Sequence, residues 1–547
     1  MGLLESLLAT SPLTVAGTLF GAYVLLLVFY RARTEYYIRR SGGVRAPVIT
    51  SNPITVFLRI GHYQLKHQLL AGFNSLFSVA TPESPNTVEM CFTGKVRFLL
   101  TKEPEHIKTV LTSKFADFGK GPMFHQVWSP FLGDSIFTTD GKTWQDNRSL
   151  IRPMFIKDRV SDLAIFDKWT STMIEKFPAS GVTFDISDLF YRMTLDVTTD
   201  FLLGHSVNSL GNPKHHFAHA FNEVQSYQMF YTIMAPFEHF LPHGKYNRGI
   251  KVIEEFILPF IQEALDLPPS ELEKLSKSDK DFTFLHNIAR FTRDPKIIRD
   301  QLVAILLAGR DTTAATLSWT LYELTRYPSI YAKLRNEILT TVGPKRAPSY
   351  EDLKSMKYLT NCLQETLRLY PAVPFNVRSA LSTTTLPGKN GAPDIAVLEG
   401  DSVVYSTLAM QRRRDLYPEE SETFADPAIY SPERWENWQP KPWQYVPFNG
   451  GPRICVGQNF ANTEMAFTSE RTPSSPFPAP GFHVSTRREA VVDRVLTRDT
   501  VVRLLQKFER LEYRGDWNAQ VLKAEIVGAP GHGVPIAFFE AVDGEMA

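Results

Sequence analysis

Apolar residues recur every three to four positions over long stretches of this chain, which predicts a mostly helical protein with small sheets. The longest such stretch begins at Asp294-Pro295, where an aspartate cap and a first-turn proline indicate a helix start, and it ends at Tyr327-Pro328. A helix of that length extends for about 45–50 Å and can cross a whole domain. Further helices are predicted over residues 328–342 and 353–369. Short strand patterns lie at residues 96–100, 402–406 and 534–539.

Residues 13–30 form an uncharged stretch of 18 residues, close to the shortest helix that spans about 30 Å of hydrocarbon. Arginines follow directly at positions 31, 33, 39 and 40, whereas only Glu5 carries a charge before the stretch. The positive-inside rule then places the rest of the chain on the cytoplasmic side. Neither the early basic residues nor the cleavage site of a signal peptide is present. We therefore expect a short lumenal N-terminus (1–12), an uncleaved transmembrane anchor (13–30) and a basic, proline-containing hinge (31–54).

The remainder, residues 55–547, shows no internal repeat and no shift in composition, which predicts a single domain. A net charge of +1 and a hydrophobic content of 43% allow a large core and argue against nucleic-acid binding. Three cysteines are too few for a disulfide framework and indicate a reducing compartment. Cys91 and Cys362 are expected to be small buried hydrophobes, and only Cys455 stands in a motif.

One segment departs from its surroundings. A helical pattern over residues 460–467 stops at residues 468–499, which contain four prolines within eight positions, a density through which no helix continues. From Thr500 on, the sequence resumes as the second half of the interrupted helix. Removing residues 468–499 joins the two halves directly. We interpret this segment as an anomalous proline-rich insertion, either a translated intron or a genuine surface loop.

The motif around the third cysteine is a glycine-rich loop. It reads Phe448-Asn449-Gly450-Gly451-Pro452-Arg453-Ile454-Cys455-Val456-Gly457, and five positions fit the pattern Phe-x-x-Gly-x-Arg-x-Cys-x-Gly. A metal-bound thiolate needs close backbone approach and N–H donors, which explains the flanking glycines. The arginine adds a cation that can pair with an acidic group of a cofactor. The alternative is a buried cysteine in a turn, which the specificity of the motif disfavours.

This loop, with Gln458-Asn459-Phe460-Ala461 after it, resembles the cysteine-ligand loop of the cytochrome P-450 superfamily of haem-thiolate monooxygenases. It is most similar to fungal members that hydroxylate alkanes and fatty acids. The resemblance covers about residues 55–540, apart from 468–499. It implies the mostly α cytochrome P-450 fold, with a single haem domain behind the anchor, and haem b with the Cys455 thiolate as its axial ligand. Phe448, Arg453 and Gly457 are then expected to contact the haem, Arg453 through a propionate.

The middle of the long predicted helix reads Ala308-Gly309-Arg310-Asp311-Thr312-Thr313, which matches the oxygen-activation motif of that family at each position. Glycine costs about 1 kcal/mol in a helix interior, so Gly309 needs a reason. We expect Ala308 and Gly309 to leave room for dioxygen at the haem, Thr312 to hydrogen-bond the oxygen and Asp311 to relay protons to it. A capped or kinked helix with a polar face is the structural alternative.

Two further motifs acquire roles through the resemblance. Glu365 and Arg368 lie at i and i+3 on one predicted helix face, and Arg434 stands where the family adds a second arginine. The resemblance implies that these three form a buried structural charge cluster that holds the haem-binding core. Trp144 and Arg148 match a Trp-x-x-x-Arg pattern in which both residues contact a haem propionate.

Three smaller points complete the comparison with the family pattern. Arg378 is expected to be a further propionate partner. Ser135 stands where the alkane-oxidising members have glycine, and Gln411 where a histidine is common, and we expect little consequence from Gln411. Aromatic residues also occur in segments that contact substrate in the family, although each is more often a core residue than a pocket residue. These aromatic residues are Phe118, Phe124, Phe137, Phe230, Tyr231 and Phe375.

The resemblance implies that one oxygen atom from O2 is inserted into an apolar organic substrate, such as an alkane, a fatty acid or a hydrophobic xenobiotic. No nucleotide-binding fingerprint is visible in the sequence, so the electrons should come from a membrane-bound, NADPH-dependent cytochrome P-450 reductase, with cytochrome b5 as an additional donor. The expected location is the endoplasmic reticulum membrane, single-pass, with the catalytic domain facing the cytosol. Two alternatives stay open: a haem-thiolate isomerase or dehydratase, which Asp311-Thr312 argue against, and a non-catalytic haem-binding protein disabled by residues 468–499.

Overall fold

The computed structural model describes residues 12–49, 53–92, 96–155, 164–275, 283–422, 424–458 and 492–540. The chain forms two compact units, each built from two stretches of sequence. A strand-rich unit takes residues 1–121 and 375–410, and a helical unit takes residues 122–374 and 411–547. The sequence predicted one domain from residue 55 on, whereas this part of the chain contributes to both units.

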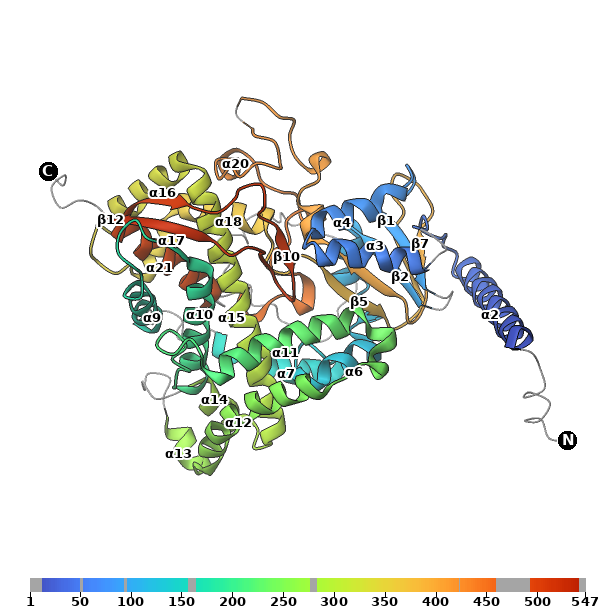
Figure 1. Cartoon of the computed structure of the whole chain (residues 1–547), viewed down its shortest axis with the longest axis horizontal. Coiled ribbons are helices and arrows are strands. Elements are labelled where there is room, and N and C mark those ends of the chain that lie inside the picture. Colours follow the sequence, from blue (N-terminus) through green and yellow to red (C-terminus); the bar gives the residue numbers. More distant parts are fainter. Residues whose placement is uncertain are drawn as a thin grey trace, which may run out of the picture. The chain divides into compact units, whose positions relative to one another are not determined.

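The strand-rich unit is built on a five-stranded sheet in the order β1-β2-β8-β5-β3 (Figure 1). Strands β1 and β2 form an antiparallel hairpin, β8 joins β2 in parallel, and β5 and β3 continue the sheet antiparallel. The strands are β1 (Thr87–Phe92), β2 (Val96–Thr101), β3 (Phe118–Gly119), β5 (Asn376–Ala380) and β8 (Ser402–Tyr405). Helices α3 (Pro53–Leu65) and α4 (Leu69–Leu76), the short helix α5 (Pro104–Lys108) and the hairpin of β6 (Thr384–Leu386) and β7 (Ile395–Val397) complete the unit. The strands predicted at residues 96–100 and 402–406 are confirmed as β2 and β8.

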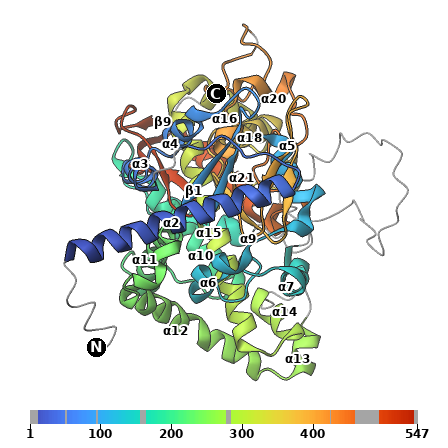
Figure 2. The ribbon, with the colours of Figure 1, turned by 90° about the vertical axis from the view of Figure 1, so that its right-hand side faces the viewer.

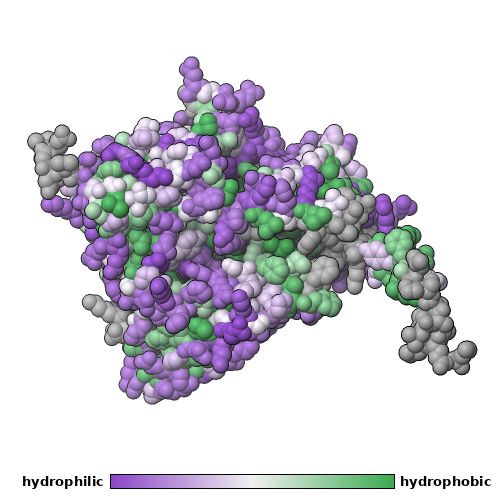
Figure 3. Space-filling model, in the orientation of Figure 1, coloured by the Kyte–Doolittle hydropathy of each residue, from purple (hydrophilic) through white to green (hydrophobic). Residues whose placement is uncertain are grey.

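The first described element is the helix α2 (Pro12–Arg40), which continues ten residues beyond the predicted anchor. Its most apolar window of 18 residues has a mean hydropathy of 1.7, and the helix is long and apolar enough to cross a membrane. Figure 2 shows α2 as one uninterrupted helix, and Figure 3 shows hydrophobic side chains on its visible surface. Leu25 is 72% exposed and Phe20 69% exposed, as expected for a helix whose natural surroundings are lipid.

Residues after α2 pair with the β6–β7 hairpin and with β1 of the same unit. The Val44 N–H donates to the Asp394 carbonyl, and the Glu89 N–H donates to the Pro47 carbonyl, both at 2.8 Å. The Arg45 guanidinium lies 3.6 Å from the buried Glu89 carboxylate. The described part of the predicted hinge is therefore helical as far as Arg40 and then bound to these strands.

The helical unit is organised around α15 (Pro295–Arg326), the longest helix of the described chain, yellow-green in Figure 1. Its predicted start is confirmed, because Asp294 Oδ1 accepts hydrogen bonds from the N–H groups of Lys296 at 2.8 Å and Ile297 at 3.4 Å. Three long helices are packed with it in one apolar core: α10 (Ile186–Leu203), α11 (His216–Ile233) and α12 (Gly244–Asp266). Other helices of this unit are α6 (Gly121–Leu132), α7 (Gly141–Ile151), α9 (Ala164–Ile174), α13 (Pro269–Lys274) and α14 (Phe284–Phe291).

The helices after α15 differ from the prediction in one place. Helix α16 (Pro328–Thr341) is confirmed, but the helix predicted over residues 353–369 is two helices, α17 (Tyr350–Ser355) and α18 (Lys357–Leu369). Met356 separates them with φ −73° and ψ 97°. The Glu337 carboxylate of α16 accepts hydrogen bonds from the N–H groups of Tyr358 and Leu359, both at 2.8 Å. A side chain from another helix therefore caps α18 and lets the chain restart there.

The C-terminal part holds helix α21 and small sheets. Helix α21 (Val492–Lys507) begins inside the segment predicted as an insertion, so the described residues 492–499 are helical. The predicted helix over residues 460–467 lies outside the described residues, as do residues 468–491. A three-stranded sheet follows in the order β4-β12-β9, made of β4 (Thr183–Asp185), β9 (Phe508–Tyr513) and β12 (Pro535–Glu540), which confirms the last predicted strand. Strands β10 (Leu522–Ala524) and β11 (Gly528–Pro530) form a separate hairpin.

Candidate active site

The loop around Cys455 lies between two short 3-10 turns, Gly451–Arg453 and Val456–Gln458. The Cys455 N–H donates to the Phe448 carbonyl at 3.0 Å, which closes the loop, and the thiol is half-buried. Gly451 has φ +66°, a conformation that favours glycine. A side chain at Gly450 would meet the Trp443 ring at 2.4 Å. Both glycines are thus required by the fold of the loop itself, in addition to the close backbone approach expected from the sequence.

Arg453 links this loop to the start of α7. Its Nη2 donates to the Asp140 carboxylate at 2.6 Å and to the Thr139 carbonyl at 2.9 Å, and its guanidinium lies 4.6 Å from the centre of the Trp144 ring. The Arg148 guanidinium lies 5.9 Å from the same ring. The structure therefore brings together the predicted residues Trp144, Arg148 and Arg453. Two guanidinium groups at one indole form a site that suits an acidic ligand group.

The oxygen-activation motif occupies a distinct position on α15. From Ile298 to Thr325 every residue of this helix is buried except Ala308, Gly309 and Thr312. The Thr312 hydroxyl donates to the Ala308 carbonyl at 2.7 Å, four residues back along the helix. The three motif residues predicted to face the oxygen site are thus the ones that keep exposed surface in an otherwise enclosed helix.

Gly309 has a structural reason that the sequence did not reveal. A Cβ atom at this position would lie 3.2 Å from Thr198 Oγ1 and 3.3 Å from Thr198 Cγ2 on α10. These distances are tighter than ordinary van der Waals contact, so glycine allows α10 to pack closely on α15. The role in dioxygen binding stays a prediction for Ala308 and Gly309.

Asp311 lies on a different face of α15 from Thr312, and it is buried. Burial raises its pKa to about 6, although the neighbouring Arg310 guanidinium and the Gln225 side chain lower it. Arg310 Nη1 donates to Asp311 Oδ1 at 2.9 Å. A carboxyl group with a pKa near neutrality exchanges protons readily at physiological pH, which suits the predicted relay.

Glu365, Arg368 and Arg434 form the predicted charge cluster, and all three side chains are fully buried. Arg368 donates to both Glu365 oxygens, at 2.7 and 2.8 Å, and Arg434 Nε donates to one of them at 3.3 Å. The Ser431 N–H and the Trp435 indole N–H also donate to this carboxylate, at 2.9 and 3.1 Å. Burial alone would raise the pKa of Glu365, but the arginines outweigh it and hold the pKa below its usual value.

Gln411 and Arg378 are two further residues that the sequence singled out. Gln411 is fully buried, and its amide donates to the carbonyls of Leu367 and Arg368, both at 3.1 Å, and accepts from the Val446 N–H at 2.8 Å. It thereby joins α18 to the segment that leads into the cysteine loop. Arg378 belongs to the strand-rich unit, where its guanidinium donates to the Asn376 side chain at 2.9 Å and to the Val377 carbonyl at 2.8 Å. Its contact with a propionate stays a prediction.

The cysteine loop and α15 share one apolar core in the helical unit. Val456, next to Cys455, packs against the cluster that contains Leu306 and Leu307, directly before Ala308. Ile136 and Phe137, from the segment before α7, pack against the same cluster. Three stretches of sequence that carry the predicted site therefore meet around one set of buried side chains.

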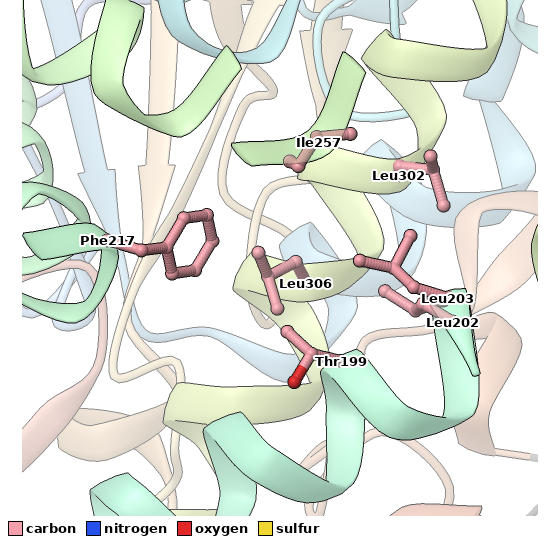
Figure 4. A pocket seen from close by; sticks show the side chains of 7 residues that line it. All are labelled: Thr199, Leu202, Leu203, Phe217, Ile257, Leu302 and Leu306. Carbon is pink, nitrogen blue, oxygen red and sulfur yellow. The ribbon is translucent and has the colours of Figure 1, made fainter. Parts of the chain in front are cut away.

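A small cavity lies beside α15 within this core (Figure 4). Its volume is about 10 Å³, which leaves room for one water molecule at most. It is lined by Thr199, Leu202, Leu203, Phe217, Ile257, Leu302 and Leu306. This cavity is too small to be a substrate pocket.

The aromatic candidates divide between core and surface. Tyr231 is 2% exposed and donates through its hydroxyl to the Pro242 carbonyl at 2.8 Å, so it is a core residue. Phe230 is 47% exposed on the same helix. Phe124 stacks on Trp128 with ring centres 5.2 Å apart. Phe118 is buried in the strand-rich unit. Their contacts with substrate stay predictions.

Comparison with known proteins decides the family. The family model described as Cytochrome P450 matches residues 52–471. The chain belongs to the cytochrome P450 family. It is 46% identical to Cytochrome P450 monooxygenase pvhE of Talaromyces variabilis over 81% of this chain and 80% of that protein. It is 39% identical to Cytochrome P450 52A4 of Candida maltosa over 68% of this chain and 71% of that protein.

Membership of the cytochrome P450 family makes this chain a monooxygenase that uses haem with a cysteine thiolate as axial ligand. The residues present fit such a group. The half-buried thiol of Cys455 lies two residues from Arg453, whose guanidinium contacts the Trp144 ring. The Arg148 guanidinium lies at the same ring, and the accessible residues of α15 belong to the same unit. Sequence reasoning missed Asp140, which anchors Arg453, and the pairing of Arg310 with Asp311. The adjacent opposite charges at positions 310 and 311 were the available signal for the second.

Proposed function

We propose that this chain hydroxylates an apolar organic substrate of the alkane or fatty-acid class. The surface that α15 leaves accessible at Ala308, Gly309 and Thr312 carries this proposal, because two small residues and one hydroxyl there leave room for an apolar substrate. The resemblance of the cysteine loop to fungal alkane- and fatty-acid-hydroxylating members supports the substrate class.

In this proposal Cys455 binds the haem iron as a thiolate, and Trp144, Arg148, Arg453 and Arg378 hold the propionates. When bound, the haem supplies the redox chemistry that activates dioxygen. Asp140 orients Arg453 through the 2.6 Å ion pair. Gln411 fixes the segment before the loop, and Phe448 closes the loop on the Cys455 N–H.

Proton delivery is assigned to Asp311 and Thr312. The Thr312 hydroxyl has the Ala308 carbonyl as its acceptor, so it can exchange that acceptor for a ligand on the exposed face of α15. Asp311 holds a proton that its pKa of about 6 makes available near neutral pH. The Glu365, Arg368 and Arg434 cluster maintains the helix and loop geometry and takes no part in the reaction.

The electrons come from a separate NADPH-dependent reductase at the same membrane, with cytochrome b5 as an additional donor. This assignment is supported by the apolar helix α2 and by the arginines at its end, from which the positive-inside rule predicts that the chain after α2 faces the cytosol. The sequence carries no nucleotide-binding fingerprint of its own.

We further propose that the catalytically competent chain lacks residues 468–499. The family model stops matching at residue 471, although described helix and strands continue to residue 540. Asp499 is 1% exposed in the core of the helical unit, and neither carboxylate oxygen has a hydrogen-bond partner. Without residues 468–499 the residue before Thr500 is Phe467, an apolar side chain that suits this core position. The full-length chain is then the non-catalytic form, disabled by residues 468–499, that the sequence left as an alternative.

The test of the function uses the chain without residues 468–499, purified with a cytochrome P450 reductase and NADPH. Lauric acid and dodecane are expected to yield hydroxylated products, identified by mass spectrometry with 18O from labelled dioxygen. The matched control is Asp311→Asn, for which we expect product to fall and reduced oxygen species to rise per NADPH consumed. Hydroxylated product without 18O, or isomerised or dehydrated product in the absence of NADPH, contradicts the proposal.

A further inference from the structure

Arg310 is a buried cation between three helices. It is 4% exposed, its Nε donates to the Tyr191 carbonyl of α10 at 3.4 Å, and its guanidinium lies 5.2 Å from the Tyr191 ring and 5.5 Å from the Phe221 ring of α11. Its ion pair is with Asp311, the next residue along α15, at 2.9 Å. Adjacent residues on a helix point in different directions, so this pair forms only because the surrounding helices turn the guanidinium toward the carboxylate.

The pair with Arg310 uses only one of the two carboxylate oxygens of Asp311. Oδ1 accepts from Arg310, whereas Oδ2 is buried and has no hydrogen-bond partner. The other polar or charged groups that act on it are the Tyr191 phenol of α10, the Gln225 amide of α11 and Glu525 between β10 and β11. Arg310 is the cation among these groups, and it opposes both burial and the negative charge of Glu525.

A buried ion pair with an unsatisfied oxygen contributes little to the stability of the folded state. Taking both charges out of water costs several kcal/mol, which is recovered only when the remaining lone pairs are satisfied. The Glu365 cluster in the same unit satisfies them, with five hydrogen bonds to one carboxylate. The Arg310–Asp311 pair does not, so its geometry is better explained by what it does to Asp311.

We propose that Arg310 is a positioning residue for Asp311, holding the carboxylate on the α10–α11 side of α15 and setting the pH range over which Asp311 takes up and releases a proton. The inference rests on the proposed proton relay through Asp311. It adds that Arg310, which takes no part in the relay itself, sets the pH at which Asp311 is protonated. Loss of the cation leaves burial and Glu525 opposed only by the Gln225 amide, so the pKa of Asp311 should rise above its value of about 6. An opposite charge at this distance typically lowers a carboxyl pKa by about 1–3 units, which gives the size of the expected change.

The same helix offers a matched control. Arg299 and Asp300 are also adjacent, buried and paired, with Nη1 3.1 Å from Oδ1. They lie eleven residues before Arg310 and Asp311, about 16 Å along the helix axis. Arg299→Gln therefore removes a buried arginine from the same helix and from the same kind of pair, away from the motif.

The experiment follows the carboxyl absorption of Asp311 by infrared spectroscopy as the pH is varied. It uses the haem-loaded chain without residues 468–499, and the band is assigned by its loss in Asp311→Asn. Arg310→Gln is expected to raise the titration midpoint by at least one pH unit, Arg310→Lys by less, and Arg299→Gln not at all. The pH at which product per NADPH begins to fall should move upward by the same amount.

An unshifted midpoint in Arg310→Gln overturns the proposal and leaves Arg310 a packing residue. If that variant does not load haem, the uncharged variant Arg310→Met carries the test, and an unshifted midpoint there overturns it equally. A shift of similar size in Arg299→Gln also contradicts the proposal, because the effect would not be local. If Asp311→Asn keeps the wild-type product yield at every pH, the proton relay fails, and the infrared midpoint still reports separately on Arg310.

Discussion

At the scale of single residues, two buried carboxylates of the helical unit, Glu365 and Asp311, differ in their hydrogen bonds and in their pKa values. Glu365 accepts five hydrogen bonds and its pKa lies below the usual value, so it stays ionised and fixed. Asp311 has one paired oxygen and a pKa of about 6, so it can change its protonation state near neutral pH. The number of satisfied lone pairs therefore differs between the structural carboxylate and the carboxylate that we propose as a proton relay.

Glu365→Gln should destabilise the helical unit strongly, because it leaves the buried Arg368 and Arg434 without their counter-charge. Breaking a buried ion pair from one side costs about 3–5 kcal/mol. Urea unfolding followed by haem absorbance measures this, and haem content should fall in parallel.

The control for that variant is Glu105→Gln, which removes a glutamate from an exposed i,i+3 pair with Lys108 at 3.1 Å. An exposed pair of this kind contributes about 1 kcal/mol or less. Equal losses in the two variants would show that the Glu365 cluster is not a buried structural unit.

At the scale of elements, α21 combines the end of the anomalous segment with the residues that follow it. Its residues 492–499 belong to the predicted insertion, and Leu496 and Thr497 are buried with Asp499 in the core. Burial, with the nearby Asp167 carboxylate, raises the pKa of Asp499 to about 7, while Arg503 lowers it. An apolar residue at that position would not have to bury an ionisable group. Phe467, which precedes Thr500 when residues 468–499 are removed, is such a residue.

The full-length chain should therefore lose stability as the pH rises from about 4 to 7. The folded state binds the Asp499 proton below its raised pKa of about 7, whereas the unfolded chain releases it near the ordinary aspartate pKa of 3.8. Within this window the free energy of unfolding falls by up to about 1.4 kcal/mol per pH unit. Urea titrations at several pH values measure the slope.

The comparison variants are Asp499→Asn and the chain without residues 468–499, both of which should lack this contribution to the slope. The shortened chain should also be more stable at pH 7 and load more haem. A full-length chain that matches the shortened one in stability and haem content would contradict the assignment of residues 468–499 as a disabling insertion.

Elements also show where local sequence reasoning stops. Helix α15 was predictable because its start signal, Asp294-Pro295, acts on its own backbone. The break between α17 and α18 was not, because the cap of α18 is Glu337 on another helix. The packing role of Gly309 was equally unpredictable, because the residue that requires a glycine there is Thr198 on another helix, α10.

At the scale of the whole molecule, the motifs were more informative than the composition. The cysteine loop, the α15 motif and the Glu-x-x-Arg pair indicated the family because each one combines residue types at fixed spacing. The division into two units could not be read from the sequence, since each unit is assembled from two separate stretches and no change in composition marks a boundary. Substrate choice depends on the shape of the pocket, which arises from packing between distant side chains.

The account depends most directly on the bond between the Cys455 sulfur and the haem iron. The measurement is the carbon monoxide difference spectrum of the reduced chain without residues 468–499, compared with its Cys455→Ser variant. We predict a thiolate-type Soret band in the first and its complete loss in the second, together with loss of substrate hydroxylation. An unchanged Soret band and undiminished hydroxylation in Cys455→Ser would contradict the account.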